Sequence, residues 1–300
     1  MLGHRAMPVF LVDGDRPALF DAGLAFLGPV YAHQIQQVLG YRQPAWCFLT
    51  HSHFDHCGAV AYLKDRFPSM KVVCSKKAAR VFERPNAISL ISDLNQFAAG
   101  MAADFGLDPG SATFQPFHVD ATAGEGDGFE ISPDCVVQTM ETPGHTWDFL
   151  SYAIPRLKLL VSSESLGTPD ETGYIVTDCL VDYDVHYQSM ERLNALDVQT
   201  LCLGHIYACT GSDARRHMNE SLLQSRRFFN MVVRLLDDEN ENVPAVMKRV
   251  KAYEWDGKSG LRQPEPAYLL NLEARINTVL KKWHASCDPD QPPLYAKTAT

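Results

Sequence analysis

The amino-acid sequence predicts an α/β fold that is followed by a C-terminal helical extension. Short apolar runs alternate with segments of helical periodicity over the first 211 residues, which is typical of an α/β domain. From residue 212 onward the apolar pattern has the spacing of long amphipathic helices only. We therefore expect a core over residues 1–211 and a helical extension over residues 212–300.

The first elements follow one another as strand, loop, helix and strand. The apolar runs at 9–12 and 18–20 flank Asp13-Gly14, which predicts two strands around a tight turn. The elements expected next are a helix at 30–39, a strand at 46–49, a helix at 60–67 that ends before Pro68, and a strand at 70–74. The strand at 46–49 is important because it leads almost directly into His51.

The second part of the core has a helix and then several strands. Residues 87–106 carry apolar residues at helical spacing, and a glycine-rich turn lies at 124–128. Strands are expected at 129–131, 135–140, 150–154, 157–161 and 200–203. In the extension, one helix shares an apolar face of Met218, Leu222, Phe229, Val233 and Leu236, and another shares Leu269, Leu272, Ile276, Val279 and Trp283.

Length, composition and charge exclude several classes of protein. A chain of 300 residues can bury a large core. Hydrophobic residues make up 46% and charged residues 21%, which excludes a disordered, collagen-like or coiled-coil chain. The 27 basic and 36 acidic residues give a net charge of −9. This argues against nucleic acid as a partner, because phosphate contacts need a basic surface.

Membrane and secretion signals are not recognised in the sequence. No stretch reaches the roughly 18 apolar residues that a membrane-spanning helix needs, and the first residues do not have the pattern of a signal peptide. The eight cysteines form no CxxC pair. We therefore expect reduced thiols, a cytoplasmic location and no contact with a membrane.

The most informative stretch is HSHFDHCG at residues 51–58, which places three histidines and one aspartate within six positions. Imidazole and carboxylate groups are preferred ligands of divalent metals. Because the stretch follows a strand, His51 and His53 are expected to point to the same side. Asp55 and His56 begin a helix and can turn toward a second centre. One stretch can therefore provide ligands to two metal ions.

This stretch resembles the HxHxDH signature of the metallo-β-lactamase superfamily. Further segments that resemble motifs of that superfamily occur in the expected order: Asp21-Ala22-Gly23, residues 142–146 around His145, and Gly204-His205. The resemblance spans about residues 8–210. It implies an αββα sandwich with a dinuclear metal site that holds zinc or iron, with manganese as a further possibility.

The resemblance also implies a role for individual residues. The first metal would be bound by His51, His53 and His145. The second would be bound by Asp55, His56 and His205. Glu164 lies where the superfamily has a bridging aspartate, and it is one methylene longer, so its bridging geometry is expected to differ. Asp21 is expected to support a ligand by a hydrogen bond.

The chemistry expected of such a site is hydrolysis. Two bound metals lower the pKa of a water to about 7, and the metal-bound hydroxide attacks the substrate. Asp55 is expected to orient that hydroxide, which makes it the catalytic residue. Tyr187 and Tyr207 are expected near the substrate, where a hydroxyl can stabilise an oxyanion. The expected substrate is a small-molecule ester or thioester.

Several alternatives stay open on the sequence alone. A phosphodiesterase of the same fold is one, and a non-catalytic regulatory or binding protein, suggested by Glu164, is another. The layout of core and C-terminal helices is also loosely similar to that of the quinolone-signal response protein, which implies an acyl-coenzyme A thioester and a di-iron centre. The extension could form a lid over the metal cleft or the interface of a homodimer.

Overall fold

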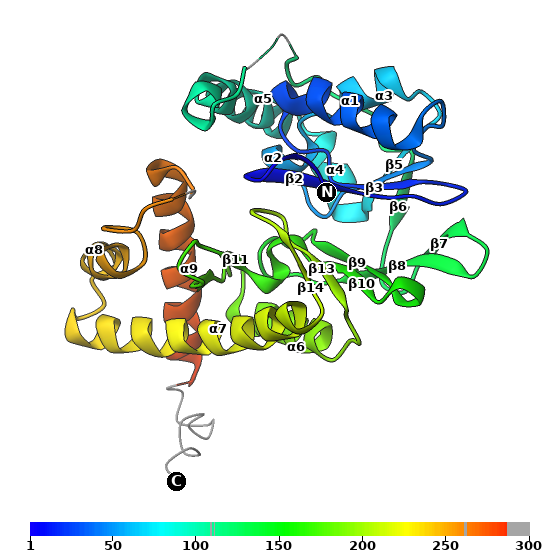
Figure 1. Ribbon diagram of the computed structural model, residues 1–300. Coiled ribbons are helices and arrows are strands. Elements are labelled where there is room, and N and C mark those ends of the chain that lie inside the picture. The colour runs from blue at the N-terminus through cyan, green and yellow to red at the C-terminus, as the bar shows by residue number, and fades with distance from the viewer. Residues whose placement is uncertain (109, 111, 261–262, 287–300) are drawn as a thin grey trace.

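The computed structural model describes residues 1–286 apart from residues 109, 111, 261 and 262. Two six-stranded sheets pack face to face, and helices cover the outer face of each sheet. Long helices extend from one side of this sandwich (Figure 1). The expected αββα sandwich with a C-terminal helical region is confirmed.

The first sheet has the strand order β1-β2-β3-β4-β5-β6. Its strands are β1 (Leu2–His4), β2 (Met7–Val12), β3 (Ala18–Phe20), β4 (Trp46–Phe48), β5 (Lys71–Ser75) and β6 (Ala121–Ala123). The predicted hairpin around Asp13-Gly14 is correct, because β2 and β3 pair in antiparallel fashion. The strands β3 to β6 run parallel to one another.

The second sheet has the order β14-β13-β10-β9-β8-β7. Its strands are β7 (Gly128–Ser132), β8 (Cys135–Glu141), β9 (Leu150–Ile154), β10 (Leu159–Val161), β13 (Thr200–Cys202) and β14 (Ala208–Thr210). A small ribbon of β11 (Thr168–Pro169) and β12 (Ile175–Val176) stands apart from it. The strand predicted at 157–161 is shorter, since Pro155–Leu157 forms a 3-10 turn and Lys158 then has φ +48°.

In the described part of the sandwich region there are six α-helices. They are α1 (Gly28–Leu39), α2 (Phe54–Cys57), α3 (Val60–Arg66), α4 (Lys76–Phe82), α5 (Pro85–Gly100) and α6 (Tyr183–Asn194). The helix predicted over 87–106 is divided, because α5 ends at Gly100 and a separate 3-10 turn covers Ala102–Phe105. Sequence periodicity cannot separate the two, since apolar residues continue at similar spacing through the break.

Aromatic side chains fill the space between the two sheets. Phe20 and Phe48 stack with ring centroids 5.4 Å apart, and Tyr152 of the opposite sheet lies 5.2 Å from Phe48. The hydroxyl of Tyr152 donates to the carbonyl of Leu49 at 2.6 Å. That hydrogen bond fixes the end of β4, directly before the histidine-rich stretch.

The extension consists of α7 (Ser212–Asp238), α8 (Val243–Glu254) and α9 (Glu265–Ser286). The first half of α7 packs on the second sheet through Ala214 and Met218. Its second half joins α8 and α9 in a separate apolar cluster that includes Phe228 and Val232. The long helix α7 therefore connects the sandwich to the helical cluster (Figure 1). The division of the chain into two domains stays a prediction.

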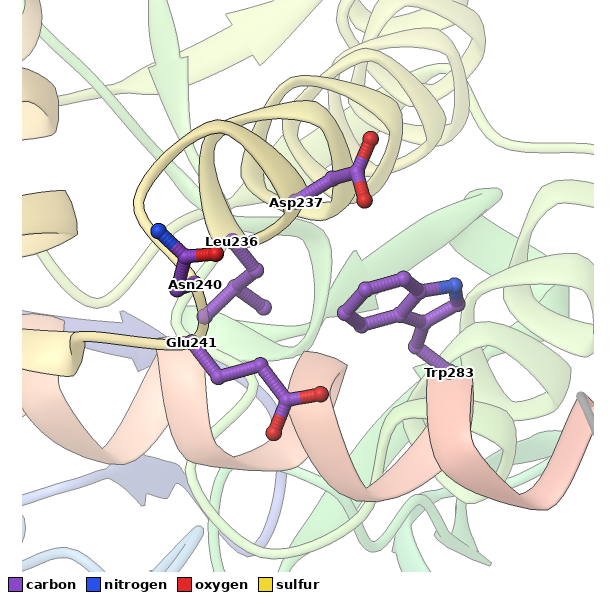
Figure 2. A pocket seen from close by; sticks show the side chains of 5 residues that line it. All are labelled: Leu236, Asp237, Asn240, Glu241 and Trp283. Carbon is purple, nitrogen blue, oxygen red and sulfur yellow. The ribbon is translucent and has the colours of Figure 1, made fainter.

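A depression of about 310 Å³ lies on the extension. Figure 2 shows its lining side chains, among which Leu236 faces the indole of Trp283. Asp237, Asn240 and Glu241 complete its lining, so none of the predicted site residues contributes to it.

Over the described part of the chain, every helix is too short or too polar to cross a lipid bilayer. Seven of the cysteines lie in that part, and each is buried with a free thiol. Cys287 lies outside the described residues.

Candidate metal centre

The candidate site lies where the carboxyl ends of strands from both sheets meet. The parallel strands β3 and β4 end just before Asp21 and His51. In the second sheet, β8, β10 and β13 run in one direction, and they end before His145, Glu164 and His205 respectively. The sandwich topology therefore brings residues that are far apart in the sequence to one edge.

The structure brings all seven predicted metal-binding residues together. They form three overlapping groups, in each of which the donor atoms lie within 4.8 Å of one another. The groups are His51, His53 and His145; His51, His56 and Glu164; and Asp55, His56 and His205. The first and third match the two ligand sets expected from the sequence, and the second connects them through Glu164.

Glu164 occupies the centre of this arrangement. Its Oε1 lies 2.9 Å from Nε2 of His56 and 2.8 Å from Nε2 of His205, while Oε2 lies 3.9 Å from Nδ1 of His51. The carboxylate of Asp55 lies 3.7 Å from Nε2 of His205. The longer side chain of Glu164 thus reaches the second ligand set and also approaches the first.

The donor atoms fit a metal because buried lone pairs have no other partner. The Glu164 side chain is only 4% exposed, its Oε2 makes no hydrogen bond, and its Oε1 contacts only Nε2 of His56 and Nε2 of His205, which are themselves candidate ligands. Nε2 of His51 is also buried without a partner. A buried polar atom without a partner costs free energy, and a bound cation would remove that cost. Imidazole nitrogens together with carboxylates suit zinc or iron.

Four histidines are oriented by hydrogen bonds from Nδ1. His145 donates to the carbonyl of Asp178 at 2.9 Å, and His205 donates to the carbonyl of Ala6 at 2.8 Å. His56 donates to Asp21 at 2.9 Å. His51 contacts the hydroxyl of Thr50 at 3.0 Å, and that hydroxyl in turn donates to Asp21. Each of these imidazoles therefore carries its proton on Nδ1, and the lone pair of Nε2 is available to bind a metal ion.

Asp21 supports both ligand sets. It is buried and adopts φ +59°, a conformation that costs free energy for a residue other than glycine. Its Oδ1 accepts the backbone N–H of Thr50 at 2.8 Å, and its Oδ2 accepts Nδ1 of His56. The supporting role expected for Asp21 agrees with these contacts.

Burial and neighbouring charges shift the pKa values of the histidines in opposite directions in the two ligand sets. Burial, followed by the nearby histidines, holds the pKa of His51 well below its usual value and lowers the pKa of His53 to about 4. These imidazoles stay neutral, as metal ligands must. Burial alone would also lower the pKa of His56, but Glu164, Asp55 and Asp21 together raise it well above the usual value. The three carboxylates thus stabilise a positive charge beside them, either a proton on His56 or a bound cation.

Tyr187 and Tyr207, the two tyrosines expected near the substrate, lie in different surroundings. Tyr207 follows His205 and is 37% exposed. Tyr187 lies on α6, stacks on Tyr183 with centroids 6.1 Å apart, and has the guanidinium of Arg226 4.9 Å from its ring centroid. The structure therefore places Tyr187 against α7. A substrate contact stays a prediction for both.

Some site residues were missed by the sequence analysis. Asp148 accepts the backbone N–H of Ser52 at 2.9 Å, between two predicted ligands. Asn95 of α5 donates to the carbonyl of Phe54 at 3.1 Å and so fixes the start of α2. Asp148 lies only three positions after His145 and could have been considered on that ground. Asn95 and Asp178 carry no local signal.

Comparison with known proteins supports this picture. The family model of the metallo-beta-lactamase superfamily matches residues 6–205. The hydroxyacylglutathione hydrolase of Rhizobium meliloti is 28% identical over 159 residues, which are 53% of this chain and 46% of that protein. The protein of the same name from Ruegeria pomeroyi is 26% identical over 68% of this chain and 62% of its own length. The chain thus spans about half to three fifths of these relatives.

Solved structures agree in fold. A metallo-beta-lactamase family protein from Thermus thermophilus superposes with a TM-score of 0.61 at 15% identity, covering 93% of this chain and 89% of its own. An archaeal metallo-beta-lactamase superfamily protein from Sulfolobus tokodaii gives a TM-score of 0.58 at 15% identity, covering 92% and 93%. Because these coverages are high, the similarity includes most of the chain.

Proposed function

Because the chain belongs to the metallo-beta-lactamase superfamily, we propose that it is a metal-dependent hydrolase that cleaves the thioester bond of a small molecule. The observation that carries the proposal is the convergence of seven side chains whose donor atoms lie within 4.8 Å of one another in each group. Two of those donors, Oε2 of Glu164 and Nε2 of His51, are buried and make no hydrogen bond.

The proposed centre holds two metal ions in each chain, zinc or iron. His51, His53 and His145 would hold the first ion, and Asp55, His56 and His205 the second. Glu164 would contact both. When bound, such ions supply Lewis-acid chemistry: they activate water and polarise a carbonyl oxygen.

The residues of this chain have distinct tasks in the proposed reaction. The neutral histidines of the first set donate lone pairs at physiological pH, because burial lowers the pKa of each one. Asp55 is the most exposed of the three carboxylates near His56, with 14% of its side chain accessible. It is therefore the one placed to orient the attacking water. Asp21 keeps His56 in one tautomer.

A thioester is the bond class favoured by the relatives. Their name gives hydroxyacylglutathione, a thioester, as the compound on which they act. The net charge of −9 also disfavours a nucleic-acid phosphodiester, since such a substrate calls for a basic surface. The substrate proposed here is therefore an acyl thioester of a small thiol.

A hydrolysis panel tests the proposal. Protein loaded with zinc or with iron is assayed on an acylglutathione, an acyl-coenzyme A, an aryl ester and an aryl phosphodiester. We expect turnover of a thioester that falls by at least about 100-fold in His53→Ala. The matched control is His33→Ala, which removes an exposed histidine from α1. Preference for the phosphodiester, or no turnover of any compound, overturns the proposal.

A further inference from the structure

The C-terminal extension contains a buried ion pair whose arginine lies near Asp178, the residue whose carbonyl orients His145. Arg275 of α9 is 1% exposed, and Nη1 and Nη2 donate to the two oxygens of Glu254 at 2.8 and 2.9 Å. Tyr174 and Tyr268 donate to the same carboxylate at 2.6 and 3.2 Å. The guanidinium also lies 3.9 Å from the ring centroid of Phe228. These contacts hold Arg275 in one orientation.

The remaining nitrogen of Arg275 is directed toward residue 178. Nε makes no hydrogen bond and lies 3.8 Å from Oδ1 of Asp178. One turn farther along α9, the hydroxyl of Thr278 donates to the carbonyl of Arg275 at 2.8 Å and contacts the carbonyl of Cys179 at 3.3 Å. The helix therefore contacts two successive residues of the segment 178–181 through side chains.

The same segment contacts the loop that carries His145. The carbonyl of Asp178 accepts Nδ1–H of His145 at 2.9 Å. The backbone N–H groups of Leu180 and Val181 donate to the carbonyl of Gly144 at 3.0 and 3.1 Å. Segment 178–181 is thus held by α9 on one side and holds the His145 loop on the other.

We propose that Arg275 is a positioning residue through which the C-terminal helices set the metal affinity of the first ligand set. It fixes the segment whose carbonyl orients His145, so the extension is a part of the metal centre. This inference rests on the proposed function, because it takes His145 as a metal ligand. Partners that orient a ligating histidine commonly contribute 10- to 100-fold to metal affinity.

The stability of the extension does not by itself explain the ion pair. A buried pair carries a large desolvation penalty, and apolar residues of similar size often replace it without loss of stability. The extension has its own apolar cluster, which includes Val246, Leu272 and Ile276, all fully buried. The position of the pair beside Asp178 explains its presence better than stability does.

The test removes both members of the Arg275–Glu254 pair, so that neither is left as an unpaired buried charge. The double variant Arg275→Met/Glu254→Gln removes both charges together, and Thr278→Val removes the second contact to the segment. Arg249→Met is the control, because it removes an exposed arginine of α8 that pairs with Asp238 and Glu239. Zinc affinity is measured by competition with a chelator, and Co²⁺ absorption reports the ligand environment. Thermal unfolding of the metal-free proteins is recorded alongside.

We expect the double variant to bind one of two zinc ions about 10- to 100-fold more weakly, with a changed Co²⁺ spectrum, and Thr278→Val to bind it a few-fold more weakly. The control keeps wild-type affinity. Wild-type affinity in the folded double variant, with or without a lower melting temperature, overturns the inference. If the double variant does not fold, unchanged affinity of Thr278→Val overturns it.

The failure of this inference and the failure of the proposed function give different results. A wild-type protein that binds neither zinc, iron nor Co²⁺ overturns both. A wild-type protein that binds metal and cleaves a thioester, while every variant matches it in affinity, overturns only the role of Arg275.

Discussion

Gly204 and Glu164 are packed so closely that a Cβ atom at position 204 would lie 2.2 Å from Oε1 of Glu164. Real Cβ atoms do not approach an oxygen to that distance, so one of the two groups would have to move. The absence of a side chain at Gly204 therefore makes room for the longer carboxylate. This relationship explains how a glutamate fits at the centre of the site.

The variant Gly204→Ala tests that packing. The added methyl group is expected to displace the Glu164 carboxylate and lower the affinity for at least one zinc ion by about 10-fold or more. The control is Gly100→Ala, since a Cβ at Gly100 meets nothing within 4 Å. The measurement is zinc stoichiometry and affinity by chelator competition. Full occupancy at wild-type affinity in the first variant would show that Glu164 does not depend on Gly204.

The variant Asp21→Asn tests the support of His56. Asparagine can still accept from Thr50, but its amide nitrogen cannot accept Nδ1–H of His56. We expect a 10- to 100-fold loss of zinc affinity and a loss of hydrolysis in parallel. Asp13→Asn is the control, because Asp13 is an exposed carboxylate that pairs with Arg42. Equal zinc affinity in the two variants would contradict the role given to Asp21.

Removal of the metal is expected to destabilise the fold. A ligand that binds only the folded state stabilises it by about 2.7 kcal/mol at 100 times its Kd. Chelator-treated protein should therefore melt at a lower temperature, and added zinc should restore the melting temperature. Differential scanning calorimetry measures the change. A melting temperature that does not depend on zinc would argue against a preformed metal centre.

The buried histidine His186 is expected to lower the free energy of unfolding in acid. It is 1% exposed, and burial followed by the charge of His145 lowers its pKa to about 3 from a usual value of 6.5. Between these two pH values the unfolded chain binds a proton that the folded chain does not. The free energy of unfolding therefore falls as the pH drops below 6.5, by up to about 1.4 kcal/mol per pH unit.

The substitution His186→Leu should remove the part of this sensitivity that His186 contributes, while buried His51, His53 and His145 keep theirs. Neither ring nitrogen of His186 makes a hydrogen bond, so no partner is left unsatisfied. Acid unfolding of the metal-free proteins, followed by circular dichroism, should have a lower midpoint pH in the variant than in wild type. His33→Leu, at an exposed position of α1, is the matched comparison. An unchanged midpoint in His186→Leu would refute this explanation.

The sequence predicted the parts of the site that depend on residue type. His51 and His53 follow a strand, and Asp55 lies in the short helix after it, so local periodicity places their donors near one another. The strand ends before His145, Glu164 and His205 were also visible as apolar runs. Their convergence at one edge follows from the sandwich topology, which the superfamily motifs indicated.

The contacts that orient the ligands could not be predicted in the same way. His145 and His205 donate to backbone carbonyls of residues that are 33 and 199 positions away in the chain. Any residue type can offer a carbonyl, so Asp178 and Ala6 carry no signal. The break after α5 and the contact of Tyr187 with Arg226 likewise depend on tertiary packing.

The most direct test of the central claim is a zinc titration of the metal-free protein followed by thioester hydrolysis. The account predicts that turnover rises with added zinc and reaches its maximum at two ions per chain, and that His53→Ala stays inactive throughout. A protein that binds two zinc ions and yet hydrolyses no thioester would contradict the account.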